Sequence, residues 1–290
     1  MSTAVGIVRI PYRFEALRDL VGRARLSQVL IEATEDVLAV KRVLAEVRSA
    51  GQGKLLFLLG QAGSGKTSLA ESLPIYLSDM VATVLTPPPD YELPLTKLPG
   101  WLNAELRKVR SAAKNRIIVA NLDGREIPPS DETATQAAMV NLNALLRRQA
   151  NVLAAWPVNS ESFAQSTIDR LTEAGGQSAL ATDRILRVTG LPQERFFDAL
   201  QLILATLSLR LDDAAVSVDE AQDLVDRCTT VGEYLEEVHR LVTSRYDVSG
   251  LGTKLPRLYV SITSSADTTP SCRLLRRATS SLSIPTGFSK

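Results

Sequence analysis

The chain has 290 residues, of which 45% are hydrophobic and 22% charged, and its 33 Lys and Arg residues nearly balance 32 Asp and Glu residues. This composition excludes wholesale disorder, and the near-zero net charge excludes a uniformly basic nucleic-acid binder. One histidine, His239, and two distant cysteines, Cys228 and Cys272, exclude His-based catalytic triads, disulfide frameworks and zinc sites.

The first predicted unit, residues 1–53, starts irregularly around Pro11 and then becomes helical. Apolar residues between Val37 and Val47 recur with the i, i+3/i+4 spacing of an amphipathic helix. Gly51 is the expected stop, because glycine readily adopts the backbone conformation that ends a helix.

The second unit, residues 54–190, alternates short apolar runs with amphipathic segments. The runs have strand length and cover Leu55–Leu59, Val81–Leu85, Ile117–Leu122, Val152–Trp156 and Ile185–Val188. Helical patterns separate them at residues 66–79, 99–114, 132–149 and 160–174. This alternation predicts an α/β fold, a parallel sheet with helices on both faces.

Residues 191–249 contain no strand-like run and predict a small all-α lid. Helices are expected to start at Pro192, at the capping box Ser217-x-x-Glu220 and near Thr230.

Residues 250–290 are a basic, Ser/Thr-rich C-terminal extension with one strand-like run, Leu258–Ile262. Its Arg273, Arg276 and Arg277 are a candidate contact to nucleic-acid phosphates, the alternative being a solvated basic face. No apolar run is long enough to span a membrane and the first residues lack a signal-peptide pattern, so we expect a cytoplasmic protein without membrane contact.

A complete phosphate-binding motif follows the first apolar run. Gly60-Gln61-Ala62-Gly63-Ser64-Gly65-Lys66-Thr67 matches G-x-x-x-x-G-K-[ST], and a helical pattern containing Ser68 and Leu69 comes next. Glycines let the backbone wrap around an anion, and the helix N-terminus adds partial positive charge. Lys66 would reach the β- and γ-phosphates, and the Thr67 hydroxyl would ligate Mg²⁺. The strand–loop–helix context favours this nucleotide site over a chance glycine-rich turn.

Acidic and polar residues at later strand ends complete the candidate site. Asp123 ends an apolar run in the Walker-B manner and is a second candidate Mg²⁺ ligand, although Asp123-Gly124 is also a good turn dipeptide. Gly124 occupies the place where many hydrolysing proteins carry a glutamate, so Glu126 is the nearest candidate base, or else a solvated loop residue. Asn159 could bond the γ-phosphate or the attacking water, or cap the helix that starts beside it.

The order of these motifs resembles that of the AAA+ ATPases over roughly residues 10–249. Arg18–Arg23 looks like the family's N-terminal element, which implies that Val21 and Gly22 contact the adenine. The resemblance also implies an arginine that completes the site of a neighbouring subunit. Arg184, expected just before the last strand, is the first choice, and the alternatives are Arg187, Arg147 and Arg148. The family's lid arginine is not evident, because Glu233 and Tyr234 stand in its place, and Arg240 is a possible substitute.

The combined interpretation is an ATP-binding and ATP-hydrolysing protein that uses Mg²⁺, assembles as a homo-oligomer through its nucleotide sites and acts on an unidentified macromolecular client. Gly124 keeps open a second hypothesis, a nucleotide-gated switch or scaffold with negligible hydrolysis. A small-molecule P-loop kinase is a third, disfavoured by the helical unit after residue 191.

Overall fold

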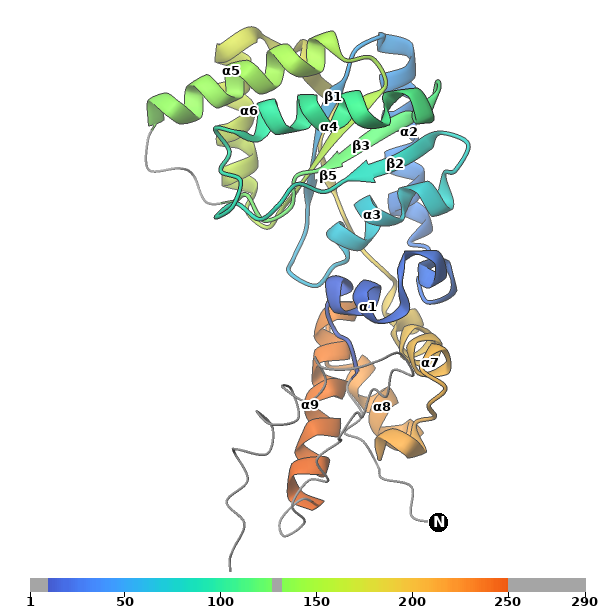
Figure 1. The fold of residues 1–290 in the computed structure, drawn as a ribbon. Coiled ribbons are helices and arrows are strands. Elements are labelled where there is room, and N and C mark those ends of the chain that lie inside the picture. Colours follow the sequence, from blue (N-terminus) through green and yellow to red (C-terminus); the bar gives the residue numbers. More distant parts are fainter. Residues whose placement is uncertain (1–9, 127–131, 250–290) are drawn as a thin grey trace, which may run out of the picture. The chain divides into compact units, whose positions relative to one another are not determined.

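A five-stranded parallel sheet organises this computed structural model, which describes residues 10–126 and 132–249 (Figure 1). Its strands are β1 (Lys54–Leu59), β2 (Val81–Leu85), β3 (Ile117–Asn121), β4 (Val152–Val158) and β5 (Leu180–Arg187). They lie in the order β2-β3-β4-β1-β5, with every neighbouring pair parallel. The predicted α/β fold with a parallel sheet is confirmed.

Helices cover both faces of this sheet. Helices α2 (Thr34–Ala50) and α3 (Lys66–Tyr76) pack on one face, and α4 (Leu98–Ala113), α5 (Glu132–Arg148) and α6 (Glu161–Gly175) pack on the other. Alternate residues of β1 serve the two faces, because successive strand side chains point in opposite directions. Leu56 and Leu58 join the cluster with α2 and α3, whereas Leu55, Phe57 and Leu59 join the other. Strand β1 is therefore buried on both sides.

Three longer helices follow the sheet, α7 (Phe196–Thr206), α8 (Val218–Val225) and α9 (Val231–Ser249). Short 3₁₀ turns accompany the helices at η1 (Arg23–Gln28), η2 (Gln177–Ala179), η3 (Gln193–Arg195) and η4 (Asp212–Ala214). The predicted capping box is present, since Ser217 Oγ accepts from the Glu220 N–H at 3.2 Å and the Glu220 carboxylate accepts from the Ser217 N–H at 2.9 Å. The predicted helix starts at Ser217 and near Thr230 are confirmed, whereas at Pro192 the turn η3 comes first and α7 begins at Phe196.

The N-terminal segment packs with these C-terminal helices, which the sequence did not predict. Helix α1 (Phe14–Val21) contributes Leu17 to an apolar cluster that also contains Val29, Phe196 and Ile203. The described residues all belong to one compact unit. The division into separate domains at residues 190 and 249 stays a prediction.

Strand β5 differs most from its expected limits. It begins at Leu180 and not at Ile185, so Arg184 lies inside the strand and the expectation that it precedes the strand is wrong. Leu180 pairs with Leu55 and Ile185 with Phe57, so the register shifts between them. β5 is an edge strand, and its residues around Thr182 are polar and exposed. A prediction from apolar runs therefore misses the first part of this strand.

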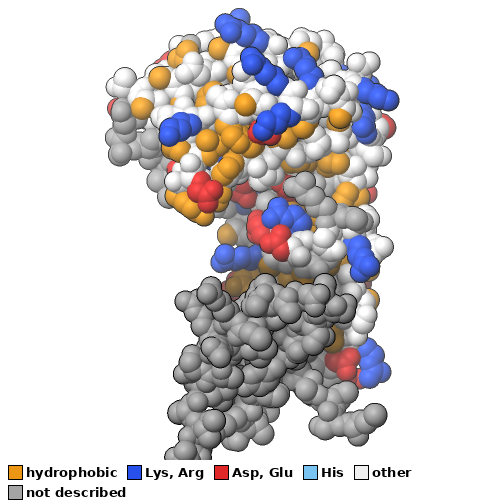
Figure 2. All heavy atoms as spheres, in the orientation of Figure 1, with side chains coloured by type: hydrophobic (Ala, Val, Ile, Leu, Met, Phe, Trp, Pro, Cys, Tyr) orange, Lys and Arg blue, Asp and Glu red, His pale blue; other side chains and the backbone are white. Residues whose placement is uncertain are grey.

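The distribution of basic side chains on the described surface is relevant to the expected nucleic-acid contact. Lys and Arg side chains are spread in separate groups over the face shown in Figure 2. Arg273, Arg276 and Arg277 lie outside the described residues, as does the Leu258–Ile262 run. Within residues 10–126 and 132–249, no helix is both long and apolar enough to cross a membrane.

Candidate nucleotide site

The turn between β1 and α3 depends on glycine. Gly63 and Gly65 have φ angles of 80° and 92°, in the region that other residues rarely adopt. A Cβ atom on Gly60 would lie 2.7 Å from Ser64 Oγ and 3.0 Å from Val188 O. Helix α3 starts at Lys66, and the first N–H groups of a helix have no intrahelical acceptor. This backbone therefore forms a cradle suited to an anion.

Lys66 lies folded over the same turn. Its Nζ donates to Gly60 O and Gln61 O, both at 2.7 Å, and to Asn159 Oδ1 at 2.8 Å. Burial lowers the pKa of Lys66, and the charges of Glu126 and Asp123 oppose that effect. The acceptors are neutral oxygens, which a more strongly accepting phosphate oxygen would replace.

Thr67 and Asp123 meet at the carboxyl end of β3. Thr67 Oγ1 donates to Asp123 Oδ2 at 2.6 Å. Hydroxyl and carboxylate oxygens are the ligand types that Mg²⁺ prefers, usually with phosphate oxygens and waters in its remaining positions. No cluster of three or more His, Cys, Asp or Glu side chains able to hold a metal occurs in the described parts of the chain. These two residues therefore fit Mg²⁺ held jointly with a nucleotide, and not a cation held by protein alone.

Glu126 and Asn159 are joined beside Lys66. Glu126 Oε1 accepts from both the backbone N–H and the side-chain Nδ2 of Asn159, each at 2.8 Å. Because Asn159 Oδ1 accepts from Lys66, the three side chains form one continuous hydrogen-bonded chain. The structure thus brings together five residues predicted for phosphate chemistry, although they come from three separate segments, the start of α3, the loop after β3 and the end of β4.

The predicted arginines lie elsewhere. Arg184 donates to Gln177 Oε1 at 2.5 Å, and Arg187 donates to Glu161 Oε1 at 2.6 Å. Arg147 donates to Gly175 O at 3.4 Å. These partners lie on α6 and η2 and not on the phosphate-binding turn. The contribution of Arg184 to a neighbouring subunit stays a prediction.

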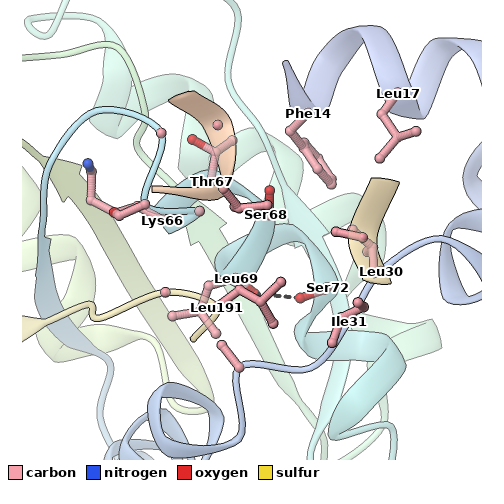
Figure 3. A pocket seen from close by; sticks show the side chains of 18 of the residues that line it. Phe14, Leu17, Leu30, Ile31, Lys66, Thr67, Ser68, Leu69, Ser72 and Leu191 are labelled. Atoms are coloured by element: carbon pink, nitrogen blue, oxygen red, sulfur yellow. Dashed lines mark hydrogen bonds between the residues drawn. The ribbon is translucent and has the colours of Figure 1, made fainter. Parts of the chain in front are cut away.

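A cavity of about 290 Å³ opens beside the turn (Figure 3). Its walls come from the turn and α3, from the N-terminal segment and from the C-terminal helices; they include Tyr12, Phe14, Leu17, Leu30, Ile31, Thr67, Leu69, Tyr76, Leu191, Ile203 and Leu235. Val21 and Gly22, predicted to contact adenine, are not among the lining residues. Gly22 instead ends α1, donating its N–H to Arg18 O at 2.8 Å.

Sequence reasoning missed the apolar walls of this cavity. The available signals were the aromatic residues Tyr12 and Phe14 and the short apolar run Val29–Ile31, which flank the Arg18–Arg23 element. The hydroxyl of Tyr76 is buried in the structure without a hydrogen-bond partner. Burial, with a smaller contribution from Glu32, raises the pKa of Tyr76 to about 12, so this phenol stays neutral at physiological pH. The cavity is therefore mainly apolar, with a neutral donor in its wall.

Helix α9 begins directly on the phosphate-binding turn. The Gly232 N–H donates to Gly63 O at 3.1 Å. Glu233, at the place expected for the lid arginine, accepts from the N–H and hydroxyl of Thr229. Arg240 bonds Glu237 on its own helix at 2.6 Å. A glycine contact thus joins α9 to the turn directly before Glu233 and Tyr234, where the resemblance led us to look for an arginine.

A solved structure shares this architecture. The Aeropyrum pernix ORC2 protein in its ADP form is 13% identical and aligns over 91% of this chain and 72% of its own, with a TM-score of 0.52. The chain has an AAA+ fold. Domain III of the Thermotoga maritima replication initiation protein DnaA is 14% identical over 81% of this chain and 93% of its own, with a TM-score of 0.48. No family model and no curated protein matches the sequence. At such identities the AAA+ likeness concerns the fold, and the function must be argued from the site.

Proposed function

We propose that this chain binds ATP with Mg²⁺ and hydrolyses it, and that assembly through the nucleotide site lets it switch or remodel a macromolecular client in the cytoplasm. The hydrogen bond of 2.6 Å between Thr67 and Asp123, beside a turn already occupied by the Lys66 ammonium, carries the proposal. It brings the two candidate magnesium ligands together next to the anion cradle. The similar ORC2 structure is an ADP form, and this supports the proposal that the ligand is an adenine nucleotide.

Each part of the site has a chemical task in this proposal. Backbone N–H groups of the turn and Lys66 neutralise the phosphate charge that grows as the bond to the γ-phosphorus breaks. Bound Mg²⁺ would supply further charge neutralisation on the phosphate oxygens. Glu126 accepts the proton of the attacking water, and Asn159 holds the Glu126 carboxylate in place. ADP and phosphate are the products.

Assembly through the nucleotide site would bring a further positive charge to the phosphates. An arginine from a second copy would stabilise the transferred phosphoryl group, as such residues do in other phosphoryl-transfer proteins. Arg184 is our first candidate because its described bond is to the neutral Gln177 side chain, which can be exchanged easily. Turnover should therefore rise more steeply than linearly with protein concentration.

A nucleotide-gated switch with negligible hydrolysis is the second candidate. Gly124, which follows Asp123, has no side chain, so no carboxylate projects from that position. Both hydrogen bonds from Asn159 end on the same Glu126 oxygen, which competes with a role as base. Phosphate release measured across a protein concentration series separates the two, since a switch releases none at any concentration.

Calorimetry with ATP and Mg²⁺ tests the shared core of both candidates. Lys66→Ala should weaken ATP binding by about 100-fold, because charged hydrogen bonds contribute about 1.5–3 kcal/mol each and 1.4 kcal/mol is tenfold. Lys108→Ala is the matched control, since Lys108 is an exposed lysine paired with Glu105 on α4. Absence of heat from wild-type protein would refute nucleotide binding. An unchanged solution mass with ATP would refute nucleotide-driven assembly alone.

A further inference from the structure

Arg125 is a buried cation at the rim of the site that sequence analysis did not single out. Only 2% of its surface is exposed. Burial lowers its pKa, against the opposing charges of Asp90 and Asp123. A buried guanidinium is expensive unless its donors are satisfied, so its partners indicate what the molecule gains from it.

The partners of Arg125 are main-chain carbonyl groups on two different loops. Nη1 donates to Asp123 O at 2.9 Å. Nη2 donates to Pro88 O at 2.5 Å and to Leu93 O at 3.3 Å. Pro88 and Leu93 belong to the connection between β2 and α4, residues 86–97. The rigid, planar fork of one arginine therefore fastens this connection to the backbone of the candidate magnesium ligand.

A second contact anchors the same connection beside the magnesium site. Thr86 bonds the carboxylate of Glu71, which also accepts from Asn121 Nδ2 at 3.2 Å. Glu71 lies one helical turn after Thr67 on α3, and Asn121 ends β3. Both ends of the Thr67–Asp123 hydrogen bond are thus braced by the connection at residues 86–97.

The turn after Asp123 needs such bracing. Gly124 has a φ angle of 72° and no atom within 4 Å of a Cβ placed on it. The Gly124 N–H donates to Asp123 Oδ1 at 2.8 Å, which orients the carboxylate within the turn. Glycine is the least restricted residue, and this local bond does not tie the Asp123 backbone to another segment. Clamping the Asp123 carbonyl restricts the backbone from which the carboxylate reaches Thr67.

We propose that Arg125 is a positioning residue that holds Asp123 for Mg²⁺ by clamping it to the connection between β2 and α4. This inference rests on the proposed function, since it concerns the metal bound with ATP. Removing a group that orients a metal ligand lowers metal affinity or activity by about 10–100-fold. Arg125 acts through Asp123 and need not touch the nucleotide.

The test compares ATP binding in Mg²⁺ with ATP binding in EDTA, together with the melting temperature of the nucleotide-free protein. In wild-type protein Mg²⁺ should tighten ATP binding, and in Arg125→Gln this enhancement should fall by about tenfold, with affinity in EDTA changed less than twofold. A merely structural role would weaken binding equally in both buffers. Arg125→Lys keeps the charge but not the planar fork, and should lose part of the enhancement.

Two further variants complete the design. Tyr91→Ser changes an 84% exposed side chain of the same connection and should leave the enhancement at the wild-type value. Pro89→Gly keeps Arg125 but loosens the chain beside Pro88, and should lower the enhancement even if the Arg125 variants do not fold. A wild-type enhancement in any folded Arg125 variant, or in Pro89→Gly, would overturn the positioning role while leaving ATP binding intact. No ATP binding by wild-type protein would instead overturn the proposed function, and this inference with it.

Discussion

The two ends of the candidate site are built in different ways. The phosphate end is polar and lies within the α/β core, where Thr67 bonds Asp123 at 2.6 Å and a separate chain of 2.8 Å bonds joins Lys66, Asn159 and Glu126. The cavity beside it is mainly apolar and combines the N-terminal segment with helices α7 and α9. The phosphate end follows from the local geometry of the turn and from the common edge at which parallel strands end, whereas the cavity end depends on tertiary packing of the N-terminal segment against distant helices. Substitutions at the phosphate end should therefore change the rate of hydrolysis, and substitutions at the cavity end should change which nucleotide binds.

Glu126→Gln should produce the largest effect on turnover at the phosphate end. The glutamine oxygen can still accept from Asn159, so the substitution removes basicity and charge but keeps the hydrogen-bonded position. ATP binding should stay within about twofold, and hydrolysis should fall about 100-fold, as expected for loss of a general base. Single-turnover phosphate release and calorimetry measure the two quantities.

The matched control is Glu161→Gln, which removes an exposed carboxylate paired with Arg187. It should alter neither binding nor hydrolysis. Unchanged hydrolysis in Glu126→Gln would remove Glu126 from the chemistry and favour the switch hypothesis.

The phosphate end could be predicted from the sequence for a physical reason. Its motif prescribes its own backbone, since positive φ angles at Gly63 and Gly65 place the N–H groups and Lys66. Strand ends in a parallel sheet meet at one edge, so Asp123 and Asn159 could be placed from the apolar runs alone. The structure brings both to this edge, but their roles in catalysis stay predictions.

The remaining features depend on packing that no local pattern encodes. Arg125 sits in a loop whose sequence gives no sign of burial, and its bonds to Pro88 and Leu93 arise when the connection at residues 86–97 folds against it. Tyr12 and Leu30 line the cavity because the N-terminal segment packs against α7 and α9, over 150 residues away. The apolar run predicts a β5 that is too short, because an edge strand tolerates polar residues that the search for apolar runs leaves out.

Gly232→Ala tests the link between the two ends and should have an intermediate effect. A Cβ on Gly232 would lie 2.6 Å from Gly63 Cα and 3.0 Å from Gly63 O, both backbone atoms that cannot rotate away. Overpacking of this kind lowers the free energy of unfolding by about 1–3 kcal/mol. Displacing α9 should also weaken ATP binding, because Val231 and Leu235 line the cavity. Denaturant unfolding and calorimetry measure the two effects.

Gly100→Ala is the comparison variant, because its expected effect on the free energy of unfolding has the opposite sign. Gly100 lies in α4 with no atom within 4 Å of an added Cβ, so alanine there should raise the free energy of unfolding by up to about 1 kcal/mol through helix propensity. If Gly232→Ala stabilised the protein as Gly100→Ala does, the close contact between α9 and the turn would be contradicted.

Tyr76→Phe should have the smallest effect and bears on the cavity end alone. The Tyr76 hydroxyl is buried without a partner in the wall of the cavity, whereas the Tyr234 hydroxyl is equally unpartnered but is not part of that wall. If a nucleotide base accepts a hydrogen bond from the Tyr76 hydroxyl, losing that bond should weaken ATP binding by about two- to tenfold, which corresponds to about 0.5–1.5 kcal/mol. Both Tyr76→Phe and Tyr234→Phe should raise the free energy of unfolding without nucleotide, because each removes a buried polar atom that lacks a partner. Only Tyr76→Phe should change ATP affinity, measured by calorimetry. Equal affinities in the two variants would mean that the base lies away from Tyr76, so that the apolar walls alone hold it.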